Sequence, residues 1–249
     1  MQITTLYSCP TKASFAGCPL EERKRFSKSH CVVGISVGQL YHEFEKFEAT
    51  INLINKSFKQ CTIVVGDTLQ RHNIAARYDV SLEKAYIMAK KAGDAWINRN
   101  TMFYQRLTIP YTITRWDYWL RSPHYFLTHE KINKFCDINP FYRRAFDLNI
   151  KTYLDRCRER GDKITNEDQL KDNCLNYLKE ECAVLIDWAS RGCNYFIYPR
   201  YIGEAMDITL QTFVNREKSI MLPVSLRFKK RENANRYSSE INFTQRTAV

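Results

Sequence analysis

Two short apolar runs with a helical pattern between them constrain the fold of this 249-residue chain most strongly. The first run, residues 31–35, contains Gly34 and leads to Ser36, and the second, residues 61–65, leads to Gly66-Asp67-Thr68. Between the runs, apolar residues recur at alternating spacings of four and three, which marks one helix face: Leu40, Phe44, Phe47, Ile51, Ile54 and Phe58. The order strand, helix, strand predicts a right-handed parallel crossover, and hence an α/β fold with a mostly parallel central sheet flanked by helices.

Ser36 is the first candidate functional residue. It would end the first strand, and ligands of open parallel α/β sheets bind at the carboxyl ends of the strands. Its hydroxyl could then face a pocket close to the positive end of the next helix. Serine is also a favoured helix N-cap, so the residues alone leave a purely structural role open.

The remaining elements are predicted from periodicity, prolines and cap signals. Further strands are expected within 107–119, at 194–198 and at 222–228. Helices are expected over 81–106, 124–135, from Pro140 towards Gly161, after the capping-box sequence 165–168, and over 203–215. We expect one domain, 31–228, between a loosely packed basic arm (1–30) and a polar basic tail (229–249).

Charge and composition limit the class of partner. The chain has 38 basic and 27 acidic residues, a formal net charge of +11, which favours a polyanionic partner. No apolar run is long enough for a transmembrane helix and the N-terminus lacks a signal-peptide pattern, so we expect a cytoplasmic protein without membrane contact. The nine cysteines and five histidines form no ligand pattern, so we expect no metal, and dinucleotide and P-loop motifs are absent.

Four basic residues on the helix predicted over 81–106 fall within about a quarter of its circumference at ~100° per residue. We name them the basic stripe: Lys84, Lys91, Arg99 and Arg106. The stripe is either a solvated helix face or a track for nucleic-acid phosphates.

A phenol and a carboxylate share one face of the helix that follows the capping box. Tyr177 and Glu181 are four residues apart, and Cys174 and Val184 extend the face at either end. The pattern fits a partly buried polar pair, but also a surface glutamate beside a boundary tyrosine.

In this order, GISVGQ at 34–39, the basic stripe, the Tyr177/Glu181 helix and Tyr198-Pro199 at a strand end resemble the cyclodipeptide synthases. That family is similar to the catalytic domains of class I tyrosyl- and tryptophanyl-tRNA synthetases, without their ATP site. The resemblance implies a Rossmann-like catalytic domain and an aminoacyltransferase that uses two aminoacyl-tRNAs to form a diketopiperazine. It implies no cofactor, and we expect a monomer.

The resemblance also implies roles for individual residues. Ser36 would be the nucleophile that holds the first aminoacyl group as an ester. Tyr177 and Glu181 would bind the ammonium group of that aminoacyl moiety, and Tyr198 would orient the site. The basic stripe would contact tRNA phosphates.

Two residues resemble the pattern of one branch of that family. Gln39 and Pro199 resemble the branch with a variable residue followed later by Tyr-Pro, rather than the branch with Asn and Tyr-His. The proton route is therefore open. The substrate-binding residues expected beside Gln39 and Pro199 are those of an apolar first amino-acid pocket: Val32, Gly34, Val184 and Phe196.

Two alternatives remain at this stage. The first is a non-catalytic tRNA- or RNA-binding domain with a synthetase-like fold. The second is a serine hydrolase, because 34–38 matches Gly-x-Ser-x-Gly as a string. Against the hydrolase, the pentapeptide follows the first predicted strand and no histidine occurs after His129, where the hydrolase order requires one.

Overall fold

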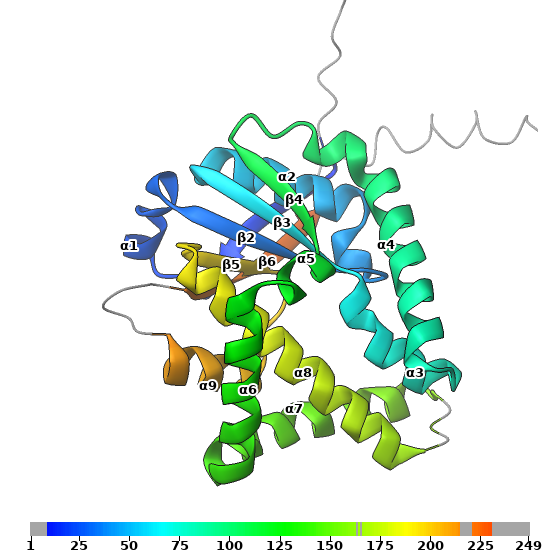
Figure 1. Cartoon of the computed structure of the whole chain (residues 1–249). Coiled ribbons are helices and arrows are strands. Elements are labelled where there is room, and N and C mark those ends of the chain that lie inside the picture. Colours follow the sequence, from blue (N-terminus) through cyan, green and yellow to red (C-terminus); the bar gives the residue numbers. More distant parts are fainter. Residues whose placement is uncertain (1–8, 163, 165, 215–220, 231–249) are drawn as a thin grey trace, which may run out of the picture.

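A six-stranded sheet forms the centre of the molecule (Figure 1). The computed structural model describes residues 9–162, 164, 166–214 and 221–230. The strand order is β1-β6-β5-β2-β3-β4, with β1 antiparallel to β6 and the other neighbours parallel. The strands are β1 Thr11–Ala16, β2 His30–Ser36, β3 Gln60–Gly66, β4 Tyr111–Arg115, β5 Tyr195–Tyr198 and β6 Leu222–Lys230. The predicted mostly parallel α/β fold is confirmed.

Helices connect the strands and cover both faces of the sheet. The α-helices are α1 Leu20–Arg23, α2 Phe44–Ser57, α3 Arg71–Tyr78, α4 Leu82–Tyr104, α5 Trp116–Leu120, α6 Pro123–Ile138, α7 Pro140–Glu159, α8 Glu167–Ser190 and α9 Glu204–Phe213. Short 3₁₀ turns are η1 Phe26–Lys28, η2 Leu40–His42 and η3 Thr68–Gln70.

The predicted crossover is present as β2-α2-β3. The two strands pair in parallel, with Ser36 level with Gly66 at their carboxyl ends. β5 pairs with the other side of β2, so that Val33 lies opposite Ile197 and Tyr198 comes just beyond. The carboxyl ends of three neighbouring parallel strands therefore lie side by side, and Ser36 lies among them.

Alternating residues of the central strands pack into two separate cores. Val32, Val64 and Phe196 belong to the core shared with α6, α7, α8 and α9. Val33 and Ile63 belong to the opposite core, shared with α2 and α4. Figure 1 shows the group of α6 to α9 below the sheet and α4 beside it. The period-two alternation of a strand separates the faces in this way.

The N-terminal segment differs from the expected loose arm. Residues 11–16 form β1, whose alternation of buried Thr11 and Ala13 with exposed Lys12 and Ser14 is that of an edge strand. Phe26 follows, with 2% of its surface exposed. The arm was mispredicted because β1 is short, and its buried residues are small or polar and alternate with exposed polar residues. β6 also runs two residues into the predicted tail, to Lys230, and the tail beyond it lies outside the described residues.

The helix after Ser36 begins later than its periodicity predicts. Leu40 is 77% exposed and Phe44 is 59% exposed, whereas Phe47, Ile51 and Ile54 are buried as expected. The cause is that Leu40 lies in the 3₁₀ turn η2, before α2, and that Phe44, the first residue of α2, has a positive φ of 47°.

Cap signals located the later helices well. The Asn139 side chain accepts a hydrogen bond from the Tyr142 amide at 3.1 Å, at the start of α7. At α8 the cap is Asn166, which accepts from the Gln169 amide at 3.0 Å, while Thr165 of the predicted capping box lies outside the described residues.

Candidate active site

Ser36 lies at the carboxyl end of β2 and does not cap a helix. Its Oγ is 2.9 Å from the hydroxyl of Tyr198, which in turn is 3.0 Å from the hydroxyl of Tyr41. Gly38, with φ +87°, turns the chain after the strand, and the Gln39 amide donates to the Ser36 carbonyl oxygen at 3.2 Å. The capping alternative is therefore wrong, and the serine hydroxyl belongs to a row of three hydroxyls.

The four residues predicted as catalytic line one small cavity. Ser36, Tyr177, Glu181 and Tyr198 reach it from β2, α8 and β5, and its volume is about 20 Å³. Tyr177 also accepts a hydrogen bond from Gln70 Nε2 at 3.4 Å. The alternative of a surface glutamate beside a boundary tyrosine does not describe this geometry.

Burial shifts the acid–base properties of these groups. It raises the pKa of Glu181 to about 8, and the adjacent charge of Glu180 acts in the same direction. Burial also raises the pKa of the Tyr177 and Tyr198 phenols well above their usual range. Both phenols therefore stay protonated near neutral pH and can donate hydrogen bonds.

A buried ion pair beside the cavity was not predicted from the sequence. Glu180, 4% exposed, accepts hydrogen bonds from Arg71 Nη1 at 2.9 Å and from the indole of Trp116 at 2.7 Å. Burial alone would raise the pKa of Glu180, but its contacts with His72 and Arg71 outweigh that effect and lower it. Arg71 and Glu180 are 109 residues apart, so no local pattern links them.

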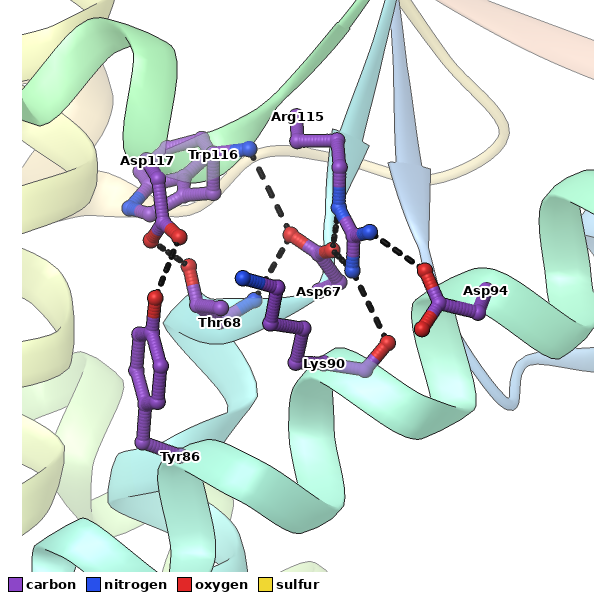
Figure 2. A network of polar contacts seen from close by, with 8 residues as sticks. All are labelled: Asp67, Thr68, Tyr86, Lys90, Asp94, Arg115, Trp116 and Asp117. Atoms are coloured by element: carbon purple, nitrogen blue, oxygen red, sulfur yellow. Dashed lines mark hydrogen bonds and ion pairs between the residues drawn. The ribbon is translucent and has the colours of Figure 1, made fainter.

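A second network fixes the turns after β3 and β4 (Figure 2). Asp67 Oδ1 accepts from the amides of Thr68 at 2.8 Å and Trp116 at 3.3 Å, while Arg115 Nε donates to Oδ2 at 2.6 Å. Asp67 is thus the N-cap of η3. A single carboxylate ties together two turns, and these turns place Leu69 and Trp116 on the cavity wall.

The predicted substrate-binding residues divide into three groups. Gly34 and Phe196 line the cavity. Val32 and Val184 do not line it, because both are fully buried in the adjoining core. Gln39, which is exposed, and Pro199 are on the turns after β2 and β5 and are not part of the cavity wall.

Lys84, Lys91 and Arg99 of the basic stripe lie on α4, whereas Arg106 follows the end of the helix, which stops at Tyr104 and not at 106 as predicted. All four side chains are exposed. Two of them make ion pairs at α2: Arg99 contacts Glu43, the residue just before the helix, at 2.9 Å, and Arg106 contacts Glu48 within it. Lys84 and Lys91 have no ion-pair partner within the described part of the chain. Half of the stripe therefore also joins two helices.

No histidine is hydrogen-bonded to Ser36 in the described residues. The ring of His42 packs 5.4 Å from the ring of Tyr198, and burial lowers the pKa of His42 to about 3. A serine–histidine hydrolase arrangement is not present. Among the described residues, no cluster of His, Cys, Asp and Glu is placed to hold a metal ion. The described helices include none that is long and apolar enough to cross a membrane.

Comparison with solved structures decides the family. A cyclodipeptide synthase structure from Fluoribacter dumoffii is 42% identical, matches 89% of this chain and 99% of its own, and superposes with a TM-score of 0.84. This chain belongs to the cyclodipeptide synthase family. No protein-family model and no curated protein matches it.

More distant synthases share the fold. The cyclodipeptide synthase of Candidatus Glomeribacter gigasporarum, solved bound to Phe-tRNAPhe, is 21% identical over 79% of this chain and 86% of its own, with a TM-score of 0.63. The Mycobacterium tuberculosis protein Rv2275, whose structure relates cyclodipeptide synthetases to type I tRNA synthetases, is 13% identical over 89% of this chain and 94% of its own. Its TM-score is 0.63.

Proposed function

We propose that this synthase joins the aminoacyl groups of two aminoacyl-tRNAs into a diketopiperazine through an aminoacyl ester on Ser36. The observation that supports this most directly is the position of the Ser36 hydroxyl. It lies at the sheet edge, 2.9 Å from the Tyr198 hydroxyl, on the wall of the cavity that Tyr177 and Glu181 also line. Family membership and the sequence resemblance support the reaction type.

In the first step, Ser36 Oγ attacks the carbonyl carbon of the first aminoacyl-tRNA. The bond from that carbon to the tRNA ribose oxygen breaks, and the departing oxygen takes up the serine proton. An aminoacyl ester is already activated, so the transfer needs no further activation, and covalent capture divides one difficult encounter into two steps. Because burial keeps Tyr198 protonated, its phenol orients the serine rather than deprotonating it.

Glu181 and Tyr177 would hold the ammonium group of the bound aminoacyl moiety. A cation beside Glu181 favours the carboxylate and forms a charge-assisted hydrogen bond with it. With a pKa of about 8 in the empty site, this group can also exchange a proton near neutral pH, as a general acid–base must.

In the second step, the amine of the second aminoacyl-tRNA attacks the Ser36 ester. The amide bond forms, the ester bond breaks and Ser36 Oγ regains a proton. The free amine of the resulting dipeptidyl-tRNA then attacks its own ester carbonyl, which closes the ring and releases the second tRNA. The basic stripe is proposed to bind tRNA phosphates. The Tyr-Pro branch is proposed from Gln39 and Pro199.

Product detection tests the proposal. The chain is expressed in a bacterial host, and the medium is searched for diketopiperazines by mass spectrometry, with Ser36→Ala as the inactive variant and Ser14→Ala, an exposed serine, as the matched control. We expect product from the parent chain and the control, and none from Ser36→Ala. A folded parent that makes no diketopiperazine, in cells or with charged tRNA, would favour the non-catalytic RNA-binding alternative.

A further inference from the structure

The cavity beside Ser36 is nearly full. Its volume is about 20 Å³, slightly more than the ~10–15 Å³ that one water molecule needs. An apolar cavity of ~150 Å³ is what admits a benzene ring. The side chains of this wall therefore leave little space for a branched or aromatic side chain.

Large aromatic side chains occupy the space. Trp116, Trp188 and Phe196 are 2%, 2% and 3% exposed, and all three line the cavity. Their rings are in contact: Trp116 and Trp188 are 6.2 Å apart between centroids, and Trp188 and Phe196 are 5.3 Å apart. The ring of Tyr198 stacks on Phe196 at 5.8 Å, which continues the row to the serine.

These rings are held on several sides. A Cβ placed on Gly34 would lie 2.5 Å from the Phe196 ring, so that ring already rests on the backbone of β2. The Trp116 indole donates to Glu180 at 2.7 Å, and Arg71 holds the same carboxylate from the other side. Enlarging the cavity would require a change of rotamer in a close-packed core or the loss of a buried hydrogen bond.

We infer that the aminoacyl group that Ser36 accepts first carries a small side chain, that of glycine, alanine or serine. The inference rests on the proposed ester at Ser36. It also refines the expectation of an apolar first pocket, because the size limit comes from the tryptophans and Phe196 and not from Val32 or Val184. The second aminoacyl group is not limited by this wall.

Intact-protein mass spectrometry tests the inference separately from the proposed function. Purified enzyme is mixed briefly with tRNA charged with one amino acid at a time, and the acyl adduct is quantified, with Ser36→Ala as the blank. We expect adducts from glycyl-, alanyl- or seryl-tRNA at least ~10-fold above those from leucyl- or phenylalanyl-tRNA, the discrimination that a methylene or more gives in a hydrophobic pocket.

Variants that shorten the wall give the reverse test. Phe196→Leu and Trp188→Leu should admit leucyl groups, with the leucyl-to-alanyl ratio raised ~10-fold or more. Trp119→Phe, a change in the same aromatic cluster but off the cavity wall, should leave the ratio unchanged. If a variant fails to fold, the adducts formed on the parent enzyme still test the size limit. Equal adducts from alanyl and leucyl groups on the parent would overturn the size limit and leave the ester intact, and no adduct from any amino acid would overturn both.

Discussion

At the scale of single residues, the neighbouring carboxyl groups of Glu180 and Glu181 have opposite environments. Arg71, His72 and the Trp116 indole surround Glu180, which is therefore charged. Glu181 faces the cavity without such partners, and its pKa is raised to about 8. Two adjacent carboxyl groups whose pKa values are driven apart are typical of acid–base sites. The charge of Glu180 thus contributes to keeping its neighbour protonated until a cation arrives.

The raised pKa of Glu181 predicts a pH-dependent stability. Between its ordinary value of 4.5 and about 8, the folded chain binds more protons at this site than the unfolded chain does. The free energy of unfolding therefore falls as pH rises through this window. Glu181→Gln removes this titrating group, so from about pH 6 to about pH 9 the variant should lose less stability than the parent, by on the order of 2–3 kcal/mol.

Urea denaturation of both proteins at the two pH values measures this difference. Glu167→Gln, a change at the partly exposed first glutamate of the same helix, serves as the control. Curves that fall in parallel for the parent and Glu181→Gln would contradict the prediction. In the same preparations, Glu181→Gln should make little diketopiperazine, because a neutral amide cannot pair with the substrate ammonium.

At the scale of elements, the basic stripe divides into two arginines that make ion pairs and two lysines that are proposed to contact tRNA. Arg106 contacts Glu48, which is 5% exposed, so Arg106→Ala leaves a buried carboxylate without its partner and should lower the free energy of unfolding by ~1–3 kcal/mol. The double variant with Lys84→Ala and Lys91→Ala should keep the free energy of unfolding of the parent but bind tRNA more weakly. The slope of log affinity against log salt should fall by about 1.5 for two lost phosphate contacts.

Binding titrations at several salt concentrations, together with denaturation curves, separate the two effects. Lys12→Ala, on the distant strand β1, controls for the loss of any single positive charge. An unchanged salt slope in the double lysine variant would remove the stripe from the proposed tRNA contact.

The sequence predicted those elements whose signals are local. The β2-α2-β3 crossover follows from apolar spacing, and α7 follows from the Asn139 cap. α5 was missed because Trp116–Leu120 continues the aromatic composition of β4. Ser36, Tyr177, Glu181 and Tyr198 lie on one cavity as the resemblance implied.

Features that depend on contacts between distant elements could not be predicted. The Arg71–Glu180 pair joins α3 to α8 across 109 residues, and each partner alone has the pattern of an ordinary charged helix position. The depth of Val32 and Val184 depends on how closely α8 packs on the sheet. Periodicity assigns a residue to a face but does not give its distance from the sheet edge.

At the scale of the whole molecule, the sheet edge formed by β1 supports the site indirectly. β1 pairs along β6 from Thr11 with Lys230 to Ala16 with Ser225. β6 in turn pairs with β5, which positions Tyr198 beside Ser36. Ala13 packs against Ala49 of α2 in a small core of its own. The N-terminal strand is therefore part of the structure that holds the serine and its tyrosine partner.

Deleting residues 1–17 should destabilise the protein and reduce its activity together. The deletion exposes the hydrogen-bonding edge of β6 and uncovers Leu226, now 5% exposed, which invites edge-to-edge association. We expect a loss on the order of 3 kcal/mol, a large fraction of the stability of a typical domain. A chain lacking only residues 1–8 provides the reference, so that the difference reports on β1. Denaturation and light scattering measure stability and association, and the diketopiperazine yield measures the site. If the shorter chain matched the reference in all three, β1 would be dispensable, and the arrangement of Ser36 and Tyr198 would depend on the parallel strands alone.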